Sequence, residues 1–227
     1  MCTKLERKKV WKLSVGYLKM VYPVSRIILS PWLRSRLIGV SCVENIPKDR
    51  AIIFVANHVG YHDALLILSV LIPYLNRKVF TITEWKLFRI PIFSRWIGAI
   101  PLYKDRSKTF ERSLQTLQKG ESVLIYPEGG INKTDTIRKV KTGAARLALA
   151  TKVLVIPIGV IRSKAYPKMR LGKFLEIFTG KLSIKIGKPV DLSEFYEKEI
   201  DRPLLDTVMK KIMLDVAQLS GKTYFGG

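Results

Sequence analysis

The chain has 227 residues and a formal net charge of +22, and 48% of its residues are hydrophobic. This length and apolar content fit one large α/β domain with a full core and a small appendage. Two cysteines exclude a framework of several disulfides and the spacing of a zinc site. The positive charge implies an anionic partner, which can be nucleic acid, an anionic membrane or an acidic protein.

The first 40 residues combine positive charge with apolar side chains. They hold nine lysines or arginines and one glutamate, with Trp11, Trp32 and many aliphatic residues between the charges. No run reaches the roughly 20 mostly apolar residues that a membrane-spanning helix needs. We expect residues 1–44 to form a basic amphipathic helical segment that lies in the membrane interface at the cytoplasmic face. The alternative is a basic helix packed on the following domain.

Strand and helix patterns alternate after this segment, which predicts one α/β domain over residues 45–227. The expected strands are 51–56, 78–83, 97–102, 121–126 and 153–159, and the expected helices are 63–74, 85–95, 107–119 and 141–151. The alternating run 182–186 predicts an edge strand, and residues 203–219 predict a closing helix that begins at Pro203. The pattern indicates a mixed, largely parallel sheet covered by helices.

Two histidines and an aspartate stand where the expected strand 51–56 turns into the helix 63–74. His58 and Asp63 would lie roughly 140° apart on a straight helix, so they can meet only if His58 is on the loop and the chain folds back. The pair would then be an imidazole oriented by a carboxylate, which is a general base. Alternatively, Asp63 caps the helix and His58 is a hydrogen-bonded loop residue. His62 is a second possible base beside the same carboxylate.

Basic side chains follow the expected strand 97–102. Lys104 and Arg106 flank one aspartate there, and an arginine can bind a phosphate through two parallel hydrogen bonds. A solvated basic turn is the alternative interpretation of this run.

A Pro-Glu-Gly-Gly sequence follows the expected strand 121–126. Gly129 and Gly130 allow positive φ and a close approach of a ligand to the backbone, and Glu128 would face that ligand. An ordinary turn is the alternative. Lys141 precedes a glycine and two alanines at a helix start, where free N–H groups suit an anion and where small residues also suit packing.

These stretches resemble, in order, the sequence blocks of the glycerolipid acyltransferases, the lysophosphatidate (1-acylglycerol-3-phosphate) acyltransferase family. Residues 57–63 resemble the family's His-four residues-Asp motif. Residues 98–106 resemble its Gly-x-Ile-Pro-Val-x-Arg block, with Lys104 at the arginine position and Arg106 two residues further on. Residues 126–129 match Phe-Pro-Glu-Gly of the third block, which helps to bind the acceptor, but Ile131 stands where that block has arginine. Two later segments, 141–148 and 155–159, complete a resemblance over residues 45–190.

The resemblance implies acyl transfer from a thioester donor, acyl-CoA or acyl carrier protein, to the sn-2 hydroxyl of lysophosphatidate, which gives phosphatidate in phospholipid biosynthesis. His58 would be the general base and Asp63 its orienting partner. The residues implied to bind substrate are Lys104, Arg106, Glu128, Gly129, Gly130 and Lys141. No metal or organic cofactor is implied.

The expected partners are the thioester donor, the lysophospholipid acceptor and an anionic membrane surface, without nucleic acid. One rival is a related acyltransferase with another acceptor, such as glycerol 3-phosphate or a lyso-aminolipid. The other rival is a non-catalytic basic protein that binds membrane or RNA. An RNA-binding surface would place aromatic residues among the basic runs of the domain, and they do not recur there.

Overall fold

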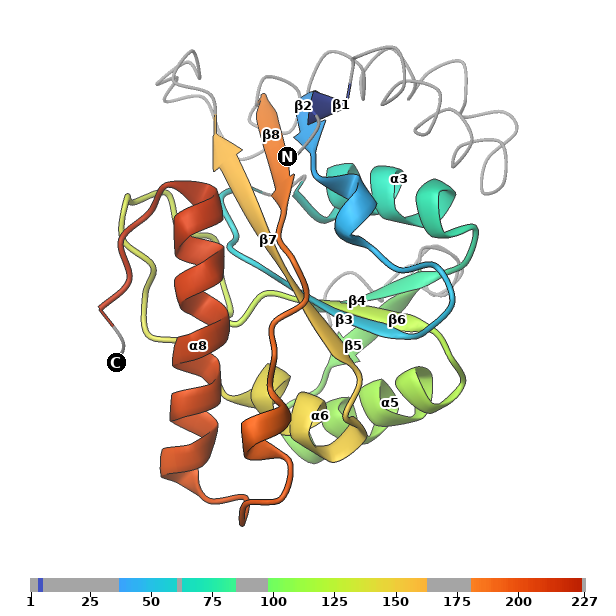
Figure 1. Cartoon of the computed structure of the whole chain (residues 1–227), viewed down its shortest axis with the longest axis vertical. Coiled ribbons are helices and arrows are strands. Elements are labelled where there is room, and N and C mark those ends of the chain that lie inside the picture. Colours follow the sequence, from blue (N-terminus) through green and yellow to red (C-terminus); the bar gives the residue numbers. More distant parts are fainter. Residues whose placement is uncertain (1–3, 6–36, 61–62, 85–97, 163–180, 226–227) are drawn as a thin grey trace.

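The structure of the chain is a computed structural model that describes residues 4–5, 37–60, 63–84, 98–162 and 181–225. These residues form one eight-stranded sheet with strand order β1-β2-β8-β7-β3-β6-β4-β5 (Figure 1). The strands are β1 (Lys4–Leu5), β2 (Leu37–Ser41), β3 (Ile52–Ala56), β4 (Val79–Glu84), β5 (Ala99–Leu102), β6 (Ser122–Ile125), β7 (Leu154–Arg162) and β8 (Leu182–Ile186). The helices in these ranges are η1 (Val43–Asn45), α3 (Asp63–Leu75), α5 (Arg106–Gln118), α6 (Gly143–Thr151), η3 (Ser193–Phe195) and α8 (Arg202–Ser220).

The sheet is mixed and largely parallel, which confirms the predicted fold class. Strands β7, β3, β6, β4 and β5 run in one direction. Strand β8 is antiparallel to β7 and parallel to β2, and β1 is antiparallel to β2. The carboxyl ends of the five parallel strands therefore meet at one edge of the sheet, where sites in α/β folds are built.

Helices cover both faces of the sheet around β3. Helix α3 lies on one side of this strand, and α6 and α8 lie on the other (Figure 1). Along the strand, Ile52 and Phe54 belong to the same hydrophobic cluster as α3, whereas Ile53 and Val55 belong to the cluster of α6 and α8. All five residues of β3 are buried. A strand covered on both faces needs apolar side chains on both, which explains the continuous apolar run in the sequence.

Helix α8 packs directly on β7 at Gly159. A Cβ atom at this position would lie 2.4 Å from the backbone carbonyl carbon of Leu219, so the close approach requires glycine. The helix ends at Ser220, and Gly221 reverses the chain with a φ of 69°. The residues that follow α8 therefore begin beside β7.

Most predicted elements are present. The predicted strands 51–56, 78–83, 97–102, 121–126 and 153–159 are found as β3, β4, β5, β6 and β7, and the helices 63–74, 107–119, 141–151 and 203–219 as α3, α5, α6 and α8. The predicted helix 85–95 lies outside the described residues.

The prediction of an edge strand at residues 182–186 is wrong. Strand β8 pairs with β7 on one side and with β2 on the other. Ile184 and Ile186 are buried and Lys185 is exposed. The alternation thus reflects one covered and one open face of this strand, not its place in the sheet.

The amino-terminal range also contains strands. Both β1 and β2 fall within residues 1–44, for which the sequence predicts a separate helical segment, and for these strands the prediction is wrong. Residues 1–3 and 6–36 of that segment lie outside what the structure describes. None of the helices in the described part of the chain has the length and apolar character needed to cross a membrane.

Candidate active site

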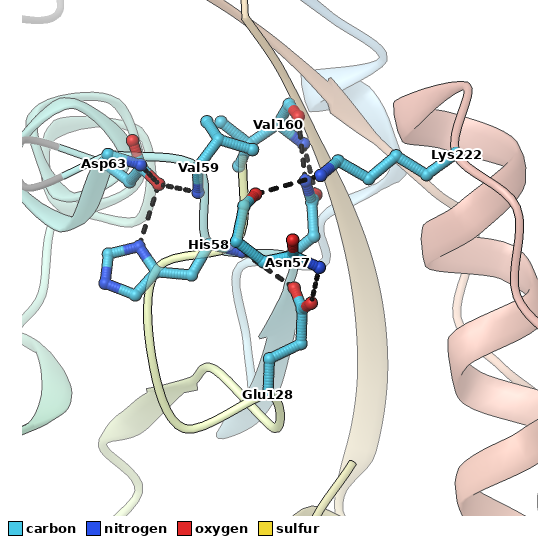
Figure 2. Close-up of polar contacts among 9 residues, drawn as sticks. Asn57, His58, Val59, Asp63, Glu128, Val160 and Lys222 are labelled. Carbon is cyan, nitrogen blue, oxygen red and sulfur yellow. Dashed lines mark hydrogen bonds and ion pairs between the residues drawn. The ribbon is translucent and has the colours of Figure 1, made fainter. Parts of the chain in front are cut away.

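The loop between β3 and α3 brings His58 back to the first residue of α3, Asp63. His58 Nδ1 lies 2.9 Å from Asp63 Oδ2 (Figure 2). The predicted contact of these two side chains is therefore confirmed. Asp63 is fully buried, whereas 20% of the His58 side chain is exposed, so the imidazole remains accessible to a ligand. His62, the other possible base, lies outside the described residues.

The Asp63 carboxylate is held by the loop that precedes it. Its Oδ2 atom also accepts hydrogen bonds from the backbone N–H groups of Val59 at 2.6 Å and Gly60 at 2.8 Å. Because a carboxylate only accepts hydrogen bonds, His58 donates its Nδ1 hydrogen to Asp63. In the neutral imidazole with this tautomer, the Nε2 atom has a free lone pair, as a general base requires. The backbone donors to Asp63 come before the helix, so this oxygen does not cap α3.

An aromatic ring supports the imidazole. Tyr126, directly after β6, stacks on His58 with ring centroids 4.4 Å apart and an interplanar angle of 27°. Burial of the phenol, together with the negative charge of Asp63, raises the pKa of Tyr126 well above its ordinary value. The hydroxyl is buried and has no hydrogen-bond partner among the residues that the structure describes. Tyr126 thus acts on His58 through its ring.

A second carboxylate, that of Glu128, forms a hydrogen bond with the backbone of His58. Glu128 Oε1 accepts a hydrogen bond from the His58 backbone N–H at 3.3 Å (Figure 2). Its Oε2 accepts from Asn132 Nδ2 at 2.6 Å and from the Arg138 backbone N–H at 3.2 Å. The sequence predicts that Glu128 faces the ligand, and its side chain is partly exposed. Both oxygens, however, accept hydrogen bonds from the protein, one of them from His58 itself.

Two buried asparagines that were not predicted as site residues join the loops of this edge. Asn57 Nδ2 donates to Val160 O at 2.9 Å, and the Val160 N–H donates to Asn57 Oδ1 at 2.7 Å. The Asn132 backbone N–H donates to His58 O at 2.6 Å. Both asparagines are fully buried, and each satisfies backbone groups near the site. A polar residue directly after an apolar strand is the signal that points to Asn57; no comparable signal marks Asn132.

The predicted glycine loop and Lys141 lie together. Gly129 has a φ of +68°, and a Cβ atom there would lie 2.9 Å from Lys141 Nζ. The Lys141 backbone N–H donates to Pro127 O at 2.9 Å. Gly129, Gly130 and Lys141 are all exposed. An ammonium group therefore stands next to the loop that carries Glu128, in contact with solvent.

Lys104 and Arg106 occupy a different part of the same sheet edge. Both are exposed and follow β5, and strands β4 and β6 separate β5 from the His58 strand. Three strand spacings correspond to about 14 Å across the sheet. Asp105 between them accepts a hydrogen bond from the Ser107 N–H at 3.0 Å and so caps α5. In the described ranges, no hydrogen bond links these two cations to His58. Among the same residues, no group of three His, Cys, Asp or Glu side chains could hold a metal ion.

The chain is similar in sequence to known proteins. The sequence model of the acyltransferase family matches residues 38–161. The chain belongs to the acyltransferase family. The match includes every residue predicted for the site, and the resemblance seen in the sequence blocks is thus confirmed.

Among relatives in this acyltransferase family, the chloroplastic 1-acyl-sn-glycerol-3-phosphate acyltransferase of Arabidopsis thaliana is 32% identical over 162 residues. That alignment covers 67% of this chain and 43% of the relative, so the chain spans less than half of the Arabidopsis protein. The 1-acyl-sn-glycerol-3-phosphate acyltransferase of Borreliella burgdorferi is 25% identical over 199 residues, which cover 82% of this chain and 76% of the relative.

A solved acyltransferase has the same fold. The crystal structure of the 1-acyl-sn-glycerophosphate acyltransferase PlsC from Thermotoga maritima superposes with a TM-score of 0.61. The comparison covers 96% of this chain and 80% of that chain, at 21% sequence identity. It therefore extends beyond the residues of the family match.

Proposed function

We propose that the protein transfers an acyl group from a thioester donor, acyl-CoA or acyl carrier protein, to the sn-2 hydroxyl of lysophosphatidate, which gives phosphatidate for phospholipid biosynthesis. The observation that carries this proposal is the contact of His58 Nδ1 with the buried Asp63 at 2.9 Å, inside the acyltransferase match. Relatives from plants and bacteria bear the name 1-acyl-sn-glycerol-3-phosphate acyltransferase, which supports lysophosphatidate as the acceptor.

In the proposed mechanism, His58 Nε2 takes the proton of the acceptor hydroxyl while the oxygen attacks the thioester carbonyl. The tetrahedral intermediate then breaks its carbon–sulfur bond, and the thiol leaves with the proton from His58. Asp63 stabilises the imidazolium that exists between these two steps. No covalent acyl-enzyme is required, because no serine or cysteine stands in a block that matches the family.

Basic side chains would bind the phosphate of the acceptor. Ile131 replaces the arginine of the family's third block, so other cations must supply the charge. Lys141 is the best placed of these, since its ammonium lies against Gly129. Lys104 and Arg106 approach from the end of β5 and are exposed. Gly129 and Gly130 would let the headgroup come close to the backbone, and Glu128 would hold this loop beside His58.

The membrane surface is the proposed location of the substrate. The net charge of +22 and the basic, apolar residues 1–44 favour attachment to an anionic cytoplasmic leaflet. The same charge favours an acidic carrier protein or the phosphates of CoA as donor.

A panel of acceptors tests the proposal. The purified 227-residue chain is assayed with acyl-CoA and with acyl carrier protein, against lysophosphatidate, glycerol 3-phosphate and a zwitterionic lysolipid. The variant His58→Ala, prepared in the same way, controls for contaminating enzymes. We expect kcat/KM to be highest for lysophosphatidate. A higher kcat/KM for a lysolipid without a phosphate monoester would mean that this lipid, and not lysophosphatidate, is the acceptor. Ile131, which stands where the family has arginine, would then explain the different preference.

A further inference from the structure

The polypeptide after α8 binds the loop that supports His58. We call residues 131–138 the Asn132 loop and residues 221–225 the C-terminal segment. The Ile137 N–H donates to Thr223 O at 2.8 Å, and the Thr223 N–H donates to Asp135 O at 2.9 Å. The two segments therefore pair like short strands, although they are far apart in the sequence.

The C-terminal segment also carries a lysine, Lys222, whose side chain extends toward His58 and Asp63. Lys222 Nζ donates to Asn132 O at 3.0 Å and to Thr134 O. Figure 2 shows the Lys222 side chain reaching toward the loop of His58. Lys222 is partly buried. Burial lowers its pKa, while the charges of Glu128, Asp135 and Asp63 act in the opposite direction and Arg138 adds to the lowering. The ammonium thus stands in the field of the two carboxylates that hold His58.

The Asn132 loop transmits this contact to His58 by two routes. Its backbone N–H at Asn132 donates directly to His58 O at 2.6 Å. Its side chain donates to Glu128 Oε2 at 2.6 Å, and Glu128 Oε1 accepts from the His58 N–H. His58, Glu128 and Asn132 therefore form a closed ring of hydrogen bonds, and Lys222 binds this ring through Asn132 O.

We propose that Lys222 is a positioning residue for acyl transfer, which fixes the Asn132 loop so that His58 keeps its orientation toward Asp63. This inference rests on the proposed function of His58. Lys222 lies outside the residues that the family model matches. It reaches the site because α8 ends against Gly159 and Gly221 reverses the chain. A misplaced catalytic group lowers the rate of the chemical step much more than it weakens binding.

The test compares Lys222→Met with Lys222→Arg in the 227-residue chain. Lys222→Met keeps the length of the side chain and removes all three donors, so we expect kcat to fall about tenfold, with both KM values changed less than about twofold. Lys222→Arg retains charge and donors and should recover most of kcat. Lys210→Met is the matched control, because Lys210 is an exposed lysine of α8, and it should behave as wild type.

A double-mutant cycle shows whether Lys222 acts through the loop. If it does, the two changes should not be independent: Lys222→Met should lower kcat less in an Asn132→Ala background than in wild type, because the route through the Asn132 side chain and Glu128 is already broken there while the backbone route to His58 remains. Independent effects of the two changes, or a normal kcat in Lys222→Met, would overturn the inference. All rates are measured at a temperature where circular dichroism shows each variant to be folded.

Hydrogen–deuterium exchange tests the same inference without a substrate. Peptides that contain the Asn132 loop should exchange faster in Lys222→Met and return to the wild-type rate in Lys222→Arg. Unchanged exchange in Lys222→Met would refute the inference even if the acceptor proves to be another lipid. Failure of acyl transfer in the wild-type protein would instead refute the proposed function.

Discussion

Replacing Asp63 by asparagine tests the centre of the proposed mechanism. The change preserves the shape of a fully buried side chain, and the amide oxygen can still accept the N–H groups of Val59 and Gly60. It removes the negative charge that faces His58 Nδ1 at 2.9 Å. We therefore expect Asp63→Asn to retain both KM values and to lose kcat, because the charge is most important while the imidazole carries the proton.

The expected fall in kcat can be estimated from the hydrogen bond that loses its charged acceptor. A hydrogen bond to a charged group contributes about 1.5–3 kcal/mol, roughly twice a neutral one, so removing the charge costs about 1–2 kcal/mol. A factor of ten in rate corresponds to about 1.4 kcal/mol, which predicts a fall in kcat of about 5–30-fold. The new amide nitrogen replaces Oδ1, which has no partner among the described residues. Stability should therefore also fall, by about 1–3 kcal/mol.

The assay measures initial rates of acyl transfer to lysophosphatidate by folded wild type, Asp63→Asn and His58→Ala. Loss of the base itself should lower kcat about 10²–10⁴-fold. His62→Ala is the matched control and should cost far less, since His62 does not hold the motif position. Wild-type kcat in both Asp63→Asn and His58→Ala would refute the mechanism. A severe loss confined to His62→Ala would mean that His62 is the base.

Four further changes test other parts of the molecule. Tyr126→Phe should keep kcat, because the ring stack remains. The pKa of Tyr126 is raised in the folded protein, so ionisation of the phenol opposes folding. The stability that the neutral phenol contributes is therefore complete below about pH 10, the pKa in the unfolded chain. It is lost as the pH rises through the pKa of the folded protein. Urea unfolding on both sides of pH 10 should therefore show a smaller alkaline loss in Tyr126→Phe. Gly129→Ala should lower stability by about 1–2 kcal/mol, measured by thermal unfolding, because φ is +68° there. Lys141→Met should raise the KM for lysophosphatidate more than the donor KM, and equal effects on both would argue against a phosphate contact. Deleting residues 1–36, which keeps β2, should weaken binding to anionic liposomes, and high salt alone should not fully release the intact protein.

Local sequence patterns were sufficient to predict the features that depend on few neighbouring residues. The apolar run at β3 predicts a strand covered on both faces, and the strand is buried throughout. The contact of His58 with Asp63 could also be expected, because the two residues are only five positions apart and a single loop decides whether they meet. Such features are set by turn geometry and burial within one short segment, so composition and spacing identify them.

The supports of His58 depend on pairings that only the tertiary structure decides. Asn57 binds Val160 across 103 positions, and Lys222 binds Asn132 across 90. The interior place of β8 depends in the same way on β2 and β7, its partners on either side. No local pattern encodes these partners, because polar side chains are satisfied by whichever backbone groups the packing of strands and helices brings near. The sequence by itself therefore determined which residues could carry the chemistry, and the packing of α8 on β7 decided what holds them in place.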